Sequence, residues 1–508
     1  MWALSPIFPD EIAFRQQLGR VFADDGVVYG LYELCPSNKK TIPLVLEPAA
    51  WLLAQAMQIM TPTEMRVLSF AAILAVVFTV VRLVAGSQNP GAGFLVLGSF
   101  LGVAGSALIF VRYEFVLELQ LLSCLVAAAW LARGRVGVVG DLAVTAGLIV
   151  GAALSVWSHL QGLLLLPLTA YLLARLAVRR LGFFGLVAGI VPFILFVPPA
   201  LTLHHSVCTE HPEIVAHWRS MTLDVSDTGI RSIGEHLIEG ARAYINSFFY
   251  SRNFPIHFLP GVDTNGFLAI INGLILVVVG SLTVLMLTLP VFLLLRSLGA
   301  SRFRADKRVL TNLLEKPQLL TIAMLIIIPV LCLFAYDTQH NFYRNFYLNH
   351  FLFVASCLVF ASLPGPGAAR VTKVGCLITG ILGGVSLISN VVLFVPPFLT
   401  GYEGPSLSVQ RNWYHAMRDT DQAAQLCKMN LQQGRIIVDD LTQAGLFTRP
   451  VAIPITYLAL QSRLIGISAY EAAISVKANY AVLRCPYFDV LGVRPQGKVG
   501  EICCYTFN

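Results

Sequence analysis

Charged residues are scarce in this sequence, and their scarcity excludes an ordinary soluble protein. Asp, Glu, Lys and Arg make up 12% of the 508 residues, whereas a soluble domain carries about 25%. Hydrophobic residues make up 56%, and the mean hydropathy is +0.73. The apolar runs repeat along the chain, and each is close to the roughly 20 residues that cross a bilayer as a helix. The composition therefore predicts a polytopic, all-α membrane protein.

The chain also lacks a secretory signal, an internal repeat and a low-complexity linker. Residues 1–9 have neither a basic segment nor an apolar core long enough for a signal peptide. Carriers often have a half-to-half repeat and a paired acid and base within a middle span. We find neither in the sequence, which argues against a transporter or flippase that moves a lipid-linked or polar substrate without chemistry. That class stays the alternative, with a non-catalytic scaffold as a third.

About ten apolar segments are candidate membrane spans. The first begins after Thr61-Pro62-Thr63-Glu64, a capping box with proline at the first helical position. The expected spans are 65–85, 94–111, 115–132, 138–157, 160–178, 183–203, 267–295, 318–336, 351–364 and 374–397. Each length is compatible with the thickness of a bilayer.

Basic residues indicate which turns face the cytoplasm. They fall on alternate turns: Arg82; Arg133 and Arg135; Arg175, Arg179 and Arg180; Arg296, Arg302, Arg304, Lys307, Arg308 and Lys316; Arg370 and Lys373. The positive-inside rule makes these turns cytoplasmic. The net charge of +7 thus reports topology, and no nucleic-acid partner is predicted. The same alternation places residues 1–64, the turns 112–114 and 158–159, the loop 204–266, the loop 337–350 and the tail outside.

The tail changes character and predicts a small extracytoplasmic α/β domain. Residues 435–440, 481–485 and 501–507 read as strands, and 469–477 reads as a helix. We therefore divide the chain into a first outer loop (1–64), a transmembrane domain (65–397) with an outer loop at 204–266, and a C-terminal domain (398–508).

Ten cysteines divide between the spans and the outer face. Cys35, Cys208, Cys427, Cys485, Cys503 and Cys504 lie outside, where oxidation can occur; Cys124, Cys332, Cys357 and Cys376 lie within spans. Pairing of Cys485 with Cys503 or with Cys504 stays open. The outer loop holds His204, His205, Cys208, Glu210, His211, Glu213 and His217, whose spacing fits no zinc pattern. No metal ligand and no cofactor is predicted, although use of a divalent cation stays open.

Asp10 and Glu11 are adjacent carboxylates at the start of an amphipathic segment. Apolar residues at Phe14, Leu18, Val21 and Phe22 share one helix face, so the segment is expected to lie on the membrane surface. Two acidic residues after a proline can simply favour the positive end of a helix. They can also supply a catalytic carboxylate on the face that carries every large polar segment.

Other polar residues of the outer face are candidates for the same site. Very short turns between spans contain Arg112, Glu114 and His159. A polar residue in such a turn is by default a candidate for a functional role. Capping of a helix end is the alternative for each. Arg344 stands among aromatic residues that could form an interfacial belt. A guanidinium at this level is well suited to hold a phosphate.

This layout resembles the GT-C superfamily of integral membrane glycosyltransferases, particularly its protein mannosyltransferase and aminoarabinose transferase branches. The shared features are the acidic pair in the first outer loop, the amphipathic helix, the Arg-x-Glu turn, the long outer loop and the outer C-terminal domain. The resemblance implies that Asp10 is the general base, with Glu11 beside it. It further implies that Lys40 binds the lipid phosphate, although Glu47–Trp51 could equally be the equivalent segment. Arg344-Asn-Phe-Tyr stands where the family has Arg-Tyr-x-x-Pro.

The expected function is an inverting transfer of a sugar from a polyprenyl-phosphate donor to a hydroxyl of a glycan, lipid or protein. A carboxylate must take the proton of the hydroxyl, and cations must stabilise the departing phosphate. Asp10 would supply the first, and Lys40, Arg344 or Arg112 the second. Glu114 and His159 are expected to contact the acceptor or another part of the substrate. The expected location is the inner membrane of a bacterium, with the site on the periplasmic face.

The outward location of residues 1–64 raises a question of export. Nothing ahead of Asp10 could carry these residues across the membrane. We therefore expect a further span upstream of Met1. Direct export of a short N-terminal tail by the span at 65–85 is the alternative.

Overall fold

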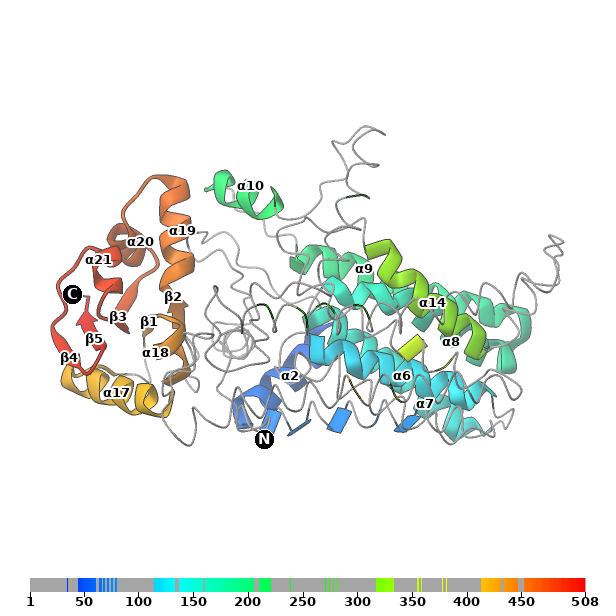
Figure 1. Cartoon of the computed structure of the whole chain (residues 1–508). Coiled ribbons are helices and arrows are strands. Elements are labelled where there is room, and N and C mark those ends of the chain that lie inside the picture. Colours follow the sequence, from blue (N-terminus) through cyan, green and yellow to red (C-terminus); the bar gives the residue numbers. More distant parts are fainter. Residues whose placement is uncertain are drawn as a thin grey trace.

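The computed structural model describes residues 44–60, 114–132, 137–158, 160–204, 210–220, 317–332, 413–430, 434–445 and 452–507, with single positions between them. The described elements before residue 413 are helices, and the C-terminal part adds a five-stranded sheet. Figure 1 shows the sheet and its helices on one side of the molecule and the apolar helices on the other.

Five apolar helices coincide with expected spans. They are α6 (Glu114–Ala132), α7 (Val138–Ser158), α8 (Leu166–Leu181), α9 (Val191–His204) and α14 (Pro317–Cys332). The 3-10 helices η4 (Leu160–Leu165) and η5 (Gly182–Gly189) precede α8 and α9. The described positions between residues 64 and 79 are also helical. The single positions described within the expected spans 267–295, 351–364 and 374–397 are helical as well, and the expected span 94–111 lies outside the described residues.

Two stretches of the described chain are long and apolar enough to cross a membrane. One is α7, and the other is the run of 42 residues from Gln161 to Thr202. Gly182 interrupts this run with a φ of 58°, a conformation that glycine adopts without strain. After it, Gly185 packs so tightly on the backbone of Ala177 and Val178 that a Cβ would overlap. The run therefore doubles back on itself, as the expected spans 160–178 and 183–203 require.

These helices present large apolar side chains outward. Val139 is 81% exposed on α7, and Phe183 and Phe184 on η5 are 81% and 79% exposed. A contiguous exposed apolar surface marks a site of contact with a membrane or another protein. On helices of this length and composition, the natural solvent for such side chains is the lipid chains of a bilayer.

Two arginines join three helices at one end of the bundle, which we call the basic end. Arg179 donates a hydrogen bond to the carbonyl oxygen of Leu131 in the last turn of α6. Arg180 Nη2 lies 2.9 Å from Asp141 Oδ2 in the first turn of α7. Trp130 Nε1 donates to the other oxygen of Asp141 at 2.7 Å. The end of α6 and the start of α7 therefore lie beside the end of α8, and the positive-inside rule predicts the cytoplasm for this end.

A hydrophobic cluster occupies the opposite end of the bundle. It joins Val116 in the first turn of α6, Trp157 in the last turn of α7 and Phe196 in α9. The helix α2 (Glu47–Ile59) packs into the same cluster through Ala50 and Leu53. This helix is not among the elements expected from the sequence, although Glu47 and Pro48 in its first turn are ordinary helix-start signals.

The C-terminal unit, residues 413–507, is an α/β structure. Its elements in order are α17 (Trp413–Leu426), β1 (Arg435–Val438), α18 (Asp440–Gly445), β2 (Ala452–Pro454), α19 (Ile455–Ile465), α20 (Ala469–Ser475), β3 (Ala478–Arg484), α21 (Tyr487–Leu491), β4 (Gly497–Val499) and β5 (Ile502–Thr506). The sheet order is β2-β1-β3-β5-β4. The first three strands are parallel, whereas β5 is antiparallel to both β3 and β4.

Side chains alternate across this sheet and form two hydrophobic clusters. Ile437, Leu483 and Cys503 belong to the cluster that includes residues of α19, α20 and α21. Ile436, Val482 and Cys504 belong to the cluster that includes residues of α17 and α18. Successive residues of a strand point to opposite faces, so the unit has helix, sheet and helix layers. β1, β3 and β5 coincide with the expected strands, and β2 and β4 are additional.

Two disulfides follow the same alternation. Cys503 of β5 pairs with Cys485 at the end of β3, which selects one of the two alternatives that the sequence leaves open. Its neighbour Cys504 points to the other face and pairs with Cys427 just after α17. One disulfide therefore ties β5 to the residue that follows β3, and the other ties β5 to the residue that follows α17.

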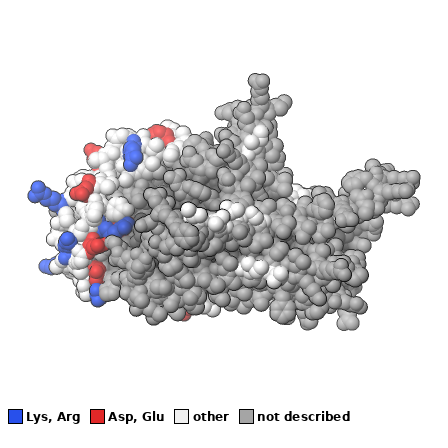
Figure 2. All heavy atoms as spheres, viewed as in Figure 1, with Lys and Arg blue, Asp and Glu red and all other residues white. Residues whose placement is uncertain are grey.

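The surface of the C-terminal unit is polar, in contrast to the apolar helices. In Figure 2 the coloured Lys, Arg, Asp and Glu side chains gather over this unit. At the start of α20, Ser468 and Glu471 form a capping box. The pKa of Glu471 lies below its usual value because the backbone N–H and the hydroxyl of Ser468 both donate to its carboxylate. The capping box agrees with the expected helix over 469–477.

Candidate functional site

Most of the expected site residues lie outside the described part of the chain. Asp10, Glu11, Lys40, Arg112, His159 and Arg344 are among the residues that the structure does not describe. Glu114 is the first residue of α6, and only its backbone is described. The structure therefore shows the surroundings of the expected site, and the assignments of these side chains stay predictions.

Three segments expected on the outer face meet in one hydrophobic cluster. Leu34 of the first loop and Ile214 and Val215 of the loop 204–266 are 5%, 0% and 7% exposed. All three belong to the cluster of α19 and the C-terminal sheet. The loop residues lie on α10 (Pro212–Ser220), which Figure 1 shows beside α19. The first loop, the long loop and the C-terminal unit are thus in contact.

The expected site residues Glu114 and His159 flank elements at the end of the bundle that carries α2. Glu114 begins α6 two residues before the clustered Val116, and α7 ends at Ser158, one residue after the clustered Trp157. Gly162 of η4 lies against the backbone of Ser155 and Val156, where a Cβ would overlap. This close approach holds the start of η4 against the last turns of α7. The backbone positions on either side of residue 159 and the start of α6 are thus at the same end.

Buried polar side chains extend from this end into the bundle. Glu118 lies one helical turn after Glu114 and is 3% exposed. Gln120 is fully buried, and its Nε2 donates to Thr169 Oγ1 of α8 at 3.4 Å. Gln161 and Ser155 are also buried. Glu118 is not among the site residues expected from the sequence, although an acidic residue inside an apolar span is itself a signal of function.

The ion pair at the basic end has a structural role. Asp141 lies within the expected span 138–157, and Arg180 lies just after the expected span 160–178. Pairs of an acid and a base within membrane spans are common in carriers. However, Asp141 lies in the first turn of α7 and Arg180 in the last turn of α8. Both Asp141 oxygens are occupied, one by Trp130 and one by Arg180. The pair therefore joins helix ends, away from the middle of the bundle where carriers place their substrate.

The C-terminal sheet offers a second candidate site, at the carboxyl ends of β1 and β3. The chain leaves β1 for β2 on one side and returns to β3 on the other. In open α/β sheets, ligands commonly bind at such a switch point. Asp439 follows β1 directly and Arg484 ends β3, and their side chains are 3.2 Å apart, Oδ2 to Nε.

The hydrogen bonds of Asp439 show that this pair joins the end of β1 to the end of β3, and we call it the clip. Its side chain is fully buried. Oδ1 accepts from the backbone N–H groups of Leu441 and Thr442 at 2.8 and 2.9 Å, and so caps α18. Oδ2 accepts from the backbone N–H of Arg484 at 2.6 Å as well as from its guanidinium. Both oxygens are engaged inside the protein, so Asp439 is not placed to act as a base.

The described residues contain no group of three or more His, Cys, Asp or Glu side chains that could hold a metal ion. Of the seven His, Cys and Glu residues considered in the outer loop, Glu210, His211, Glu213 and His217 are described, whereas His205 and Cys208 lie outside this part of the chain.

Comparison with known proteins leaves the family of the chain open. No protein-family model matches it, and no curated protein matches it. Two solved structures of ArnT from Cupriavidus metallidurans are similar to it at 12% sequence identity. The structure bound to undecaprenyl phosphate has a TM-score of 0.36, and the match covers 98% of this chain and 94% of the ArnT chain. The apo structure has a TM-score of 0.35 and covers 99% and 94%. Scores this low do not establish a shared fold.

The contacts of the Asp439 carboxylate predict what happens when this side chain is replaced. Asp439→Asn should destabilise the C-terminal unit by about 3 kcal/mol, because it leaves a largely buried guanidinium without its charge partner. Hydrogen exchange of the β1 and β3 amides, measured on the purified full chain, should accelerate strongly. Asp489→Asn in α21 is the matched control, since this residue is exposed, and should leave exchange unchanged. Normal exchange in Asp439→Asn together with a loss of activity would instead make this residue part of a catalytic site.

Proposed function

We propose that this chain is a membrane glycosyltransferase that uses a polyprenyl-phosphate-linked sugar. The observation that carries the proposal is the contact of Leu34, Ile214 and Val215 with the C-terminal unit. Segments far apart in the sequence, each expected on the outer face, gather in one assembly. The first of these segments also contains the acidic pair Asp10 and Glu11.

The proposed reaction is an inverting displacement at the anomeric carbon of the sugar. The acceptor hydroxyl oxygen forms a bond to this carbon, and the bond from the carbon to the phosphate oxygen breaks. Asp10 takes the hydroxyl proton, and Glu11 supports it. The polyprenyl phosphate leaves with the electron pair and a negative charge. Lys40, Arg344 and Arg112 stabilise that charge. No metal is required for these steps, although a divalent cation could assist the leaving phosphate.

A lipid-linked donor requires a site at the bilayer surface, and the end of the bundle with α2 suits this requirement. Glu114 begins α6 there, and the buried polar side chains Glu118 and Gln120 follow within two turns. We assign Glu114 and His159 to the acceptor or to the sugar, whose hydroxyls need polar partners. The polyprenyl chain would remain among the lipid chains beside the apolar helices.

The disulfides support the extracytoplasmic side for the C-terminal unit. Disulfides persist in oxidising compartments and are rare in the cytosol, and this unit carries two. The basic end, at which Arg179 and Arg180 join α6 and α7, would then face the cytoplasm. We infer an inner-membrane protein of a bacterium with its site on the periplasmic face. The acceptor would be a glycan, lipid or protein exposed there.

The role of Asp10 can be tested by removing its ability to accept a proton. Asp10→Asn keeps the shape of the side chain, and loss of a general base should lower the transfer rate by about 10² to 10⁴. Asp24→Asn changes another acidic residue of the first outer loop. It is the control and should keep the wild-type rate. Sugar transfer to an acceptor is the measurement. A wild-type rate in Asp10→Asn would remove Asp10 from the mechanism, and a transporter or scaffold would show this indifference.

The phosphate contacts can be tested by donor affinity. Lys40→Ala or Arg344→Ala should weaken binding of polyprenyl phosphate by roughly 1.5 to 3 kcal/mol, the value of a hydrogen bond to a charged group. Lys39→Ala, which changes the neighbouring lysine, should bind normally. Binding is measured by titration of the purified full chain, with thermal unfolding as the check on folding. If both alanine variants bind as well as the wild type, the phosphate site lies elsewhere, with Arg112 and His159 as the next residues to change.

A further inference from the structure

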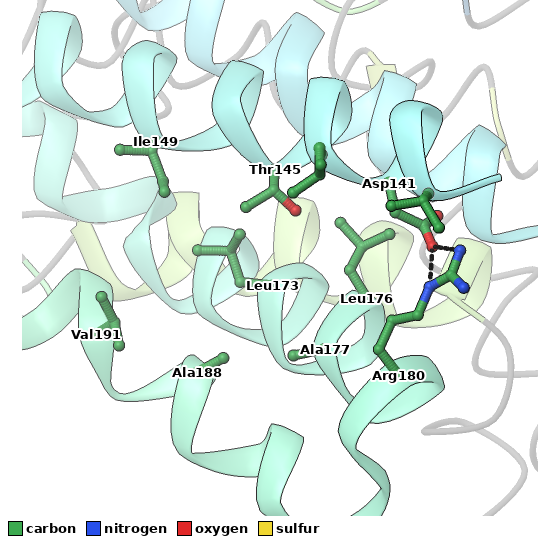
Figure 3. A pocket seen from close by; sticks show the side chains of 11 residues that line it. Asp141, Thr145, Ile149, Leu173, Leu176, Ala177, Arg180, Ala188 and Val191 are labelled. Atoms are coloured by element: carbon green, nitrogen blue, oxygen red, sulfur yellow. Dashed lines mark hydrogen bonds and ion pairs between the residues drawn. The ribbon is translucent and has the colours of Figure 1, made fainter. Parts of the chain in front are cut away.

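A cavity opens between α7, α8 and the segment formed by η5 and α9, and its lining is almost wholly apolar. Its volume is about 280 Å³. Leu173 and Leu176 of α8 and Val191 of α9 are among the side chains that line it, and Figure 3 shows the leucines pointing toward Thr145 of α7. The cavity extends from Val138 to Ile149 along α7, which is about 17 Å at 1.5 Å per residue.

Two charged residues mark one end of this cavity. Figure 3 shows Arg180 and Asp141 facing each other there, while Ile149 and Val191 lie at the opposite end. Arg180 donates to Asp141 through Nε and Nη2, and a guanidinium has five N–H donors. Its side chain remains 38% exposed. The mouth of the cavity can therefore offer further hydrogen bonds to an anionic group.

The surroundings of the cavity indicate that its occupant comes from the bilayer. Val138 and Leu142, which line it, are 59% and 64% exposed, and the adjacent Val187 is 62% exposed. An apolar cavity that opens onto an apolar surface is a poor site for water. Its volume is slightly below the range of about 300 to 1,000 Å³ for small-molecule sites. A space of this size and length suits part of one acyl chain.

The charges at this end specify the head group. The last two turns of α8 carry three arginines (Arg175, Arg179 and Arg180), whereas the first turn of α7 carries one acidic residue, Asp141. Basic pockets between membrane helices on the cytoplasmic side bind anionic head groups, and each nearby basic residue contributes about 1 kcal/mol. An anionic head group therefore complements this end, whereas a zwitterionic one gains little.

We propose that this cavity is a binding site for an anionic phospholipid of the cytoplasmic leaflet. One acyl chain occupies the space between Leu173 and Val191, and the phosphate of the head group lies against Arg180. The site is at the opposite end of the bundle from the proposed transfer site. The bound lipid would fill the gap between α7 and the hairpin of α8 and α9, and so would stabilise their packing.

The test measures lipid binding to the purified full chain in detergent. Phosphatidylglycerol and phosphatidylcholine with identical acyl chains are titrated separately, and the bound lipid is counted by native mass spectrometry. Phosphatidylglycerol should bind about fivefold to thirtyfold more tightly, as expected for one or two basic contacts. It should also raise the temperature of unfolding. Equal binding of the two lipids would overturn the proposal, and so would tighter binding of undecaprenyl phosphate at the same site.

Two matched substitutions locate the site. Ala188→Phe places a ring in the cavity that Ala188 lines and should reduce phosphatidylglycerol binding about tenfold. Val187→Phe is the control, because the adjacent Val187 is exposed and does not line the cavity; binding should not change. If Ala188→Phe fails to fold, Ala177→Leu fills the same cavity from α8. Undiminished binding in a folded cavity-filling variant would overturn the proposal.

The charge at the mouth can be tested without leaving an unpaired ion. The double substitution Asp141→Asn with Arg180→Gln removes both partners of the ion pair. It should abolish the preference for phosphatidylglycerol while binding of phosphatidylcholine stays the same. A preserved preference would show that Arg180 does not hold the head group and would overturn this assignment.

Discussion

The contacts of Arg179 with the end of α6 and of Arg180 with the start of α7 define the two ends of the helical bundle. One guanidinium caps a free carbonyl of α6, and the other pairs with Asp141 of α7. Helix ends leave backbone carbonyl groups without partners, and an apolar environment makes an unsatisfied polar group costly. These contacts hold three helix ends together, so the start of α6 and the end of α7 must lie at the other end.

The α2 helix lies at that other end, and two further segments expected on the outer face pack on the C-terminal unit. The α2 helix packs among the outer turns of α6, α7 and α9, and α10 and Leu34 pack on the C-terminal unit. The hydrophobic contacts between these segments are small, yet they join parts of the chain that are separated by hundreds of residues. One disulfide then ties the end of α17 to the C-terminal sheet, and the other joins two neighbouring strands of that sheet. We propose that this assembly positions a lipid-linked donor and an acceptor at the membrane surface.

The sequence predicts those parts of the structure that depend on local pattern. The limits of α6 and α7 agree within one residue with the expected spans 115–132 and 138–157, because the basic turn between them interrupts the apolar pattern. The sequence does not choose between Cys503 and Cys504 as the partner of Cys485. That choice depends on which face of β5 each side chain occupies and on the position of α17, which is a tertiary contact.

The candidate site was only partly predictable for a similar reason. Glu114 was accessible to sequence reasoning because it lies in a short polar turn. Glu118 also carries a sequence signal, as an acidic residue inside an apolar span, but its burial depends on the neighbouring helices rather than on its own segment. The clip between Asp439 and Arg484 likewise depends on parallel pairing of β1 with β3. Residues 435–440 predict a strand with a polar end, but not the partner of that end.

The central claim is that this chain transfers a sugar from a polyprenyl phosphate at the outer surface of the membrane. The most direct measurement incubates the purified full chain with a panel of polyprenyl-phosphate sugars and with acceptors from the cell envelope. We predict that one donor is consumed, with release of polyprenyl phosphate and appearance of the sugar on an acceptor hydroxyl. If every donor remains intact while the chain, reconstituted in vesicles, moves a lipid-linked substrate from one leaflet to the other, the claim is contradicted and the chain is a flippase.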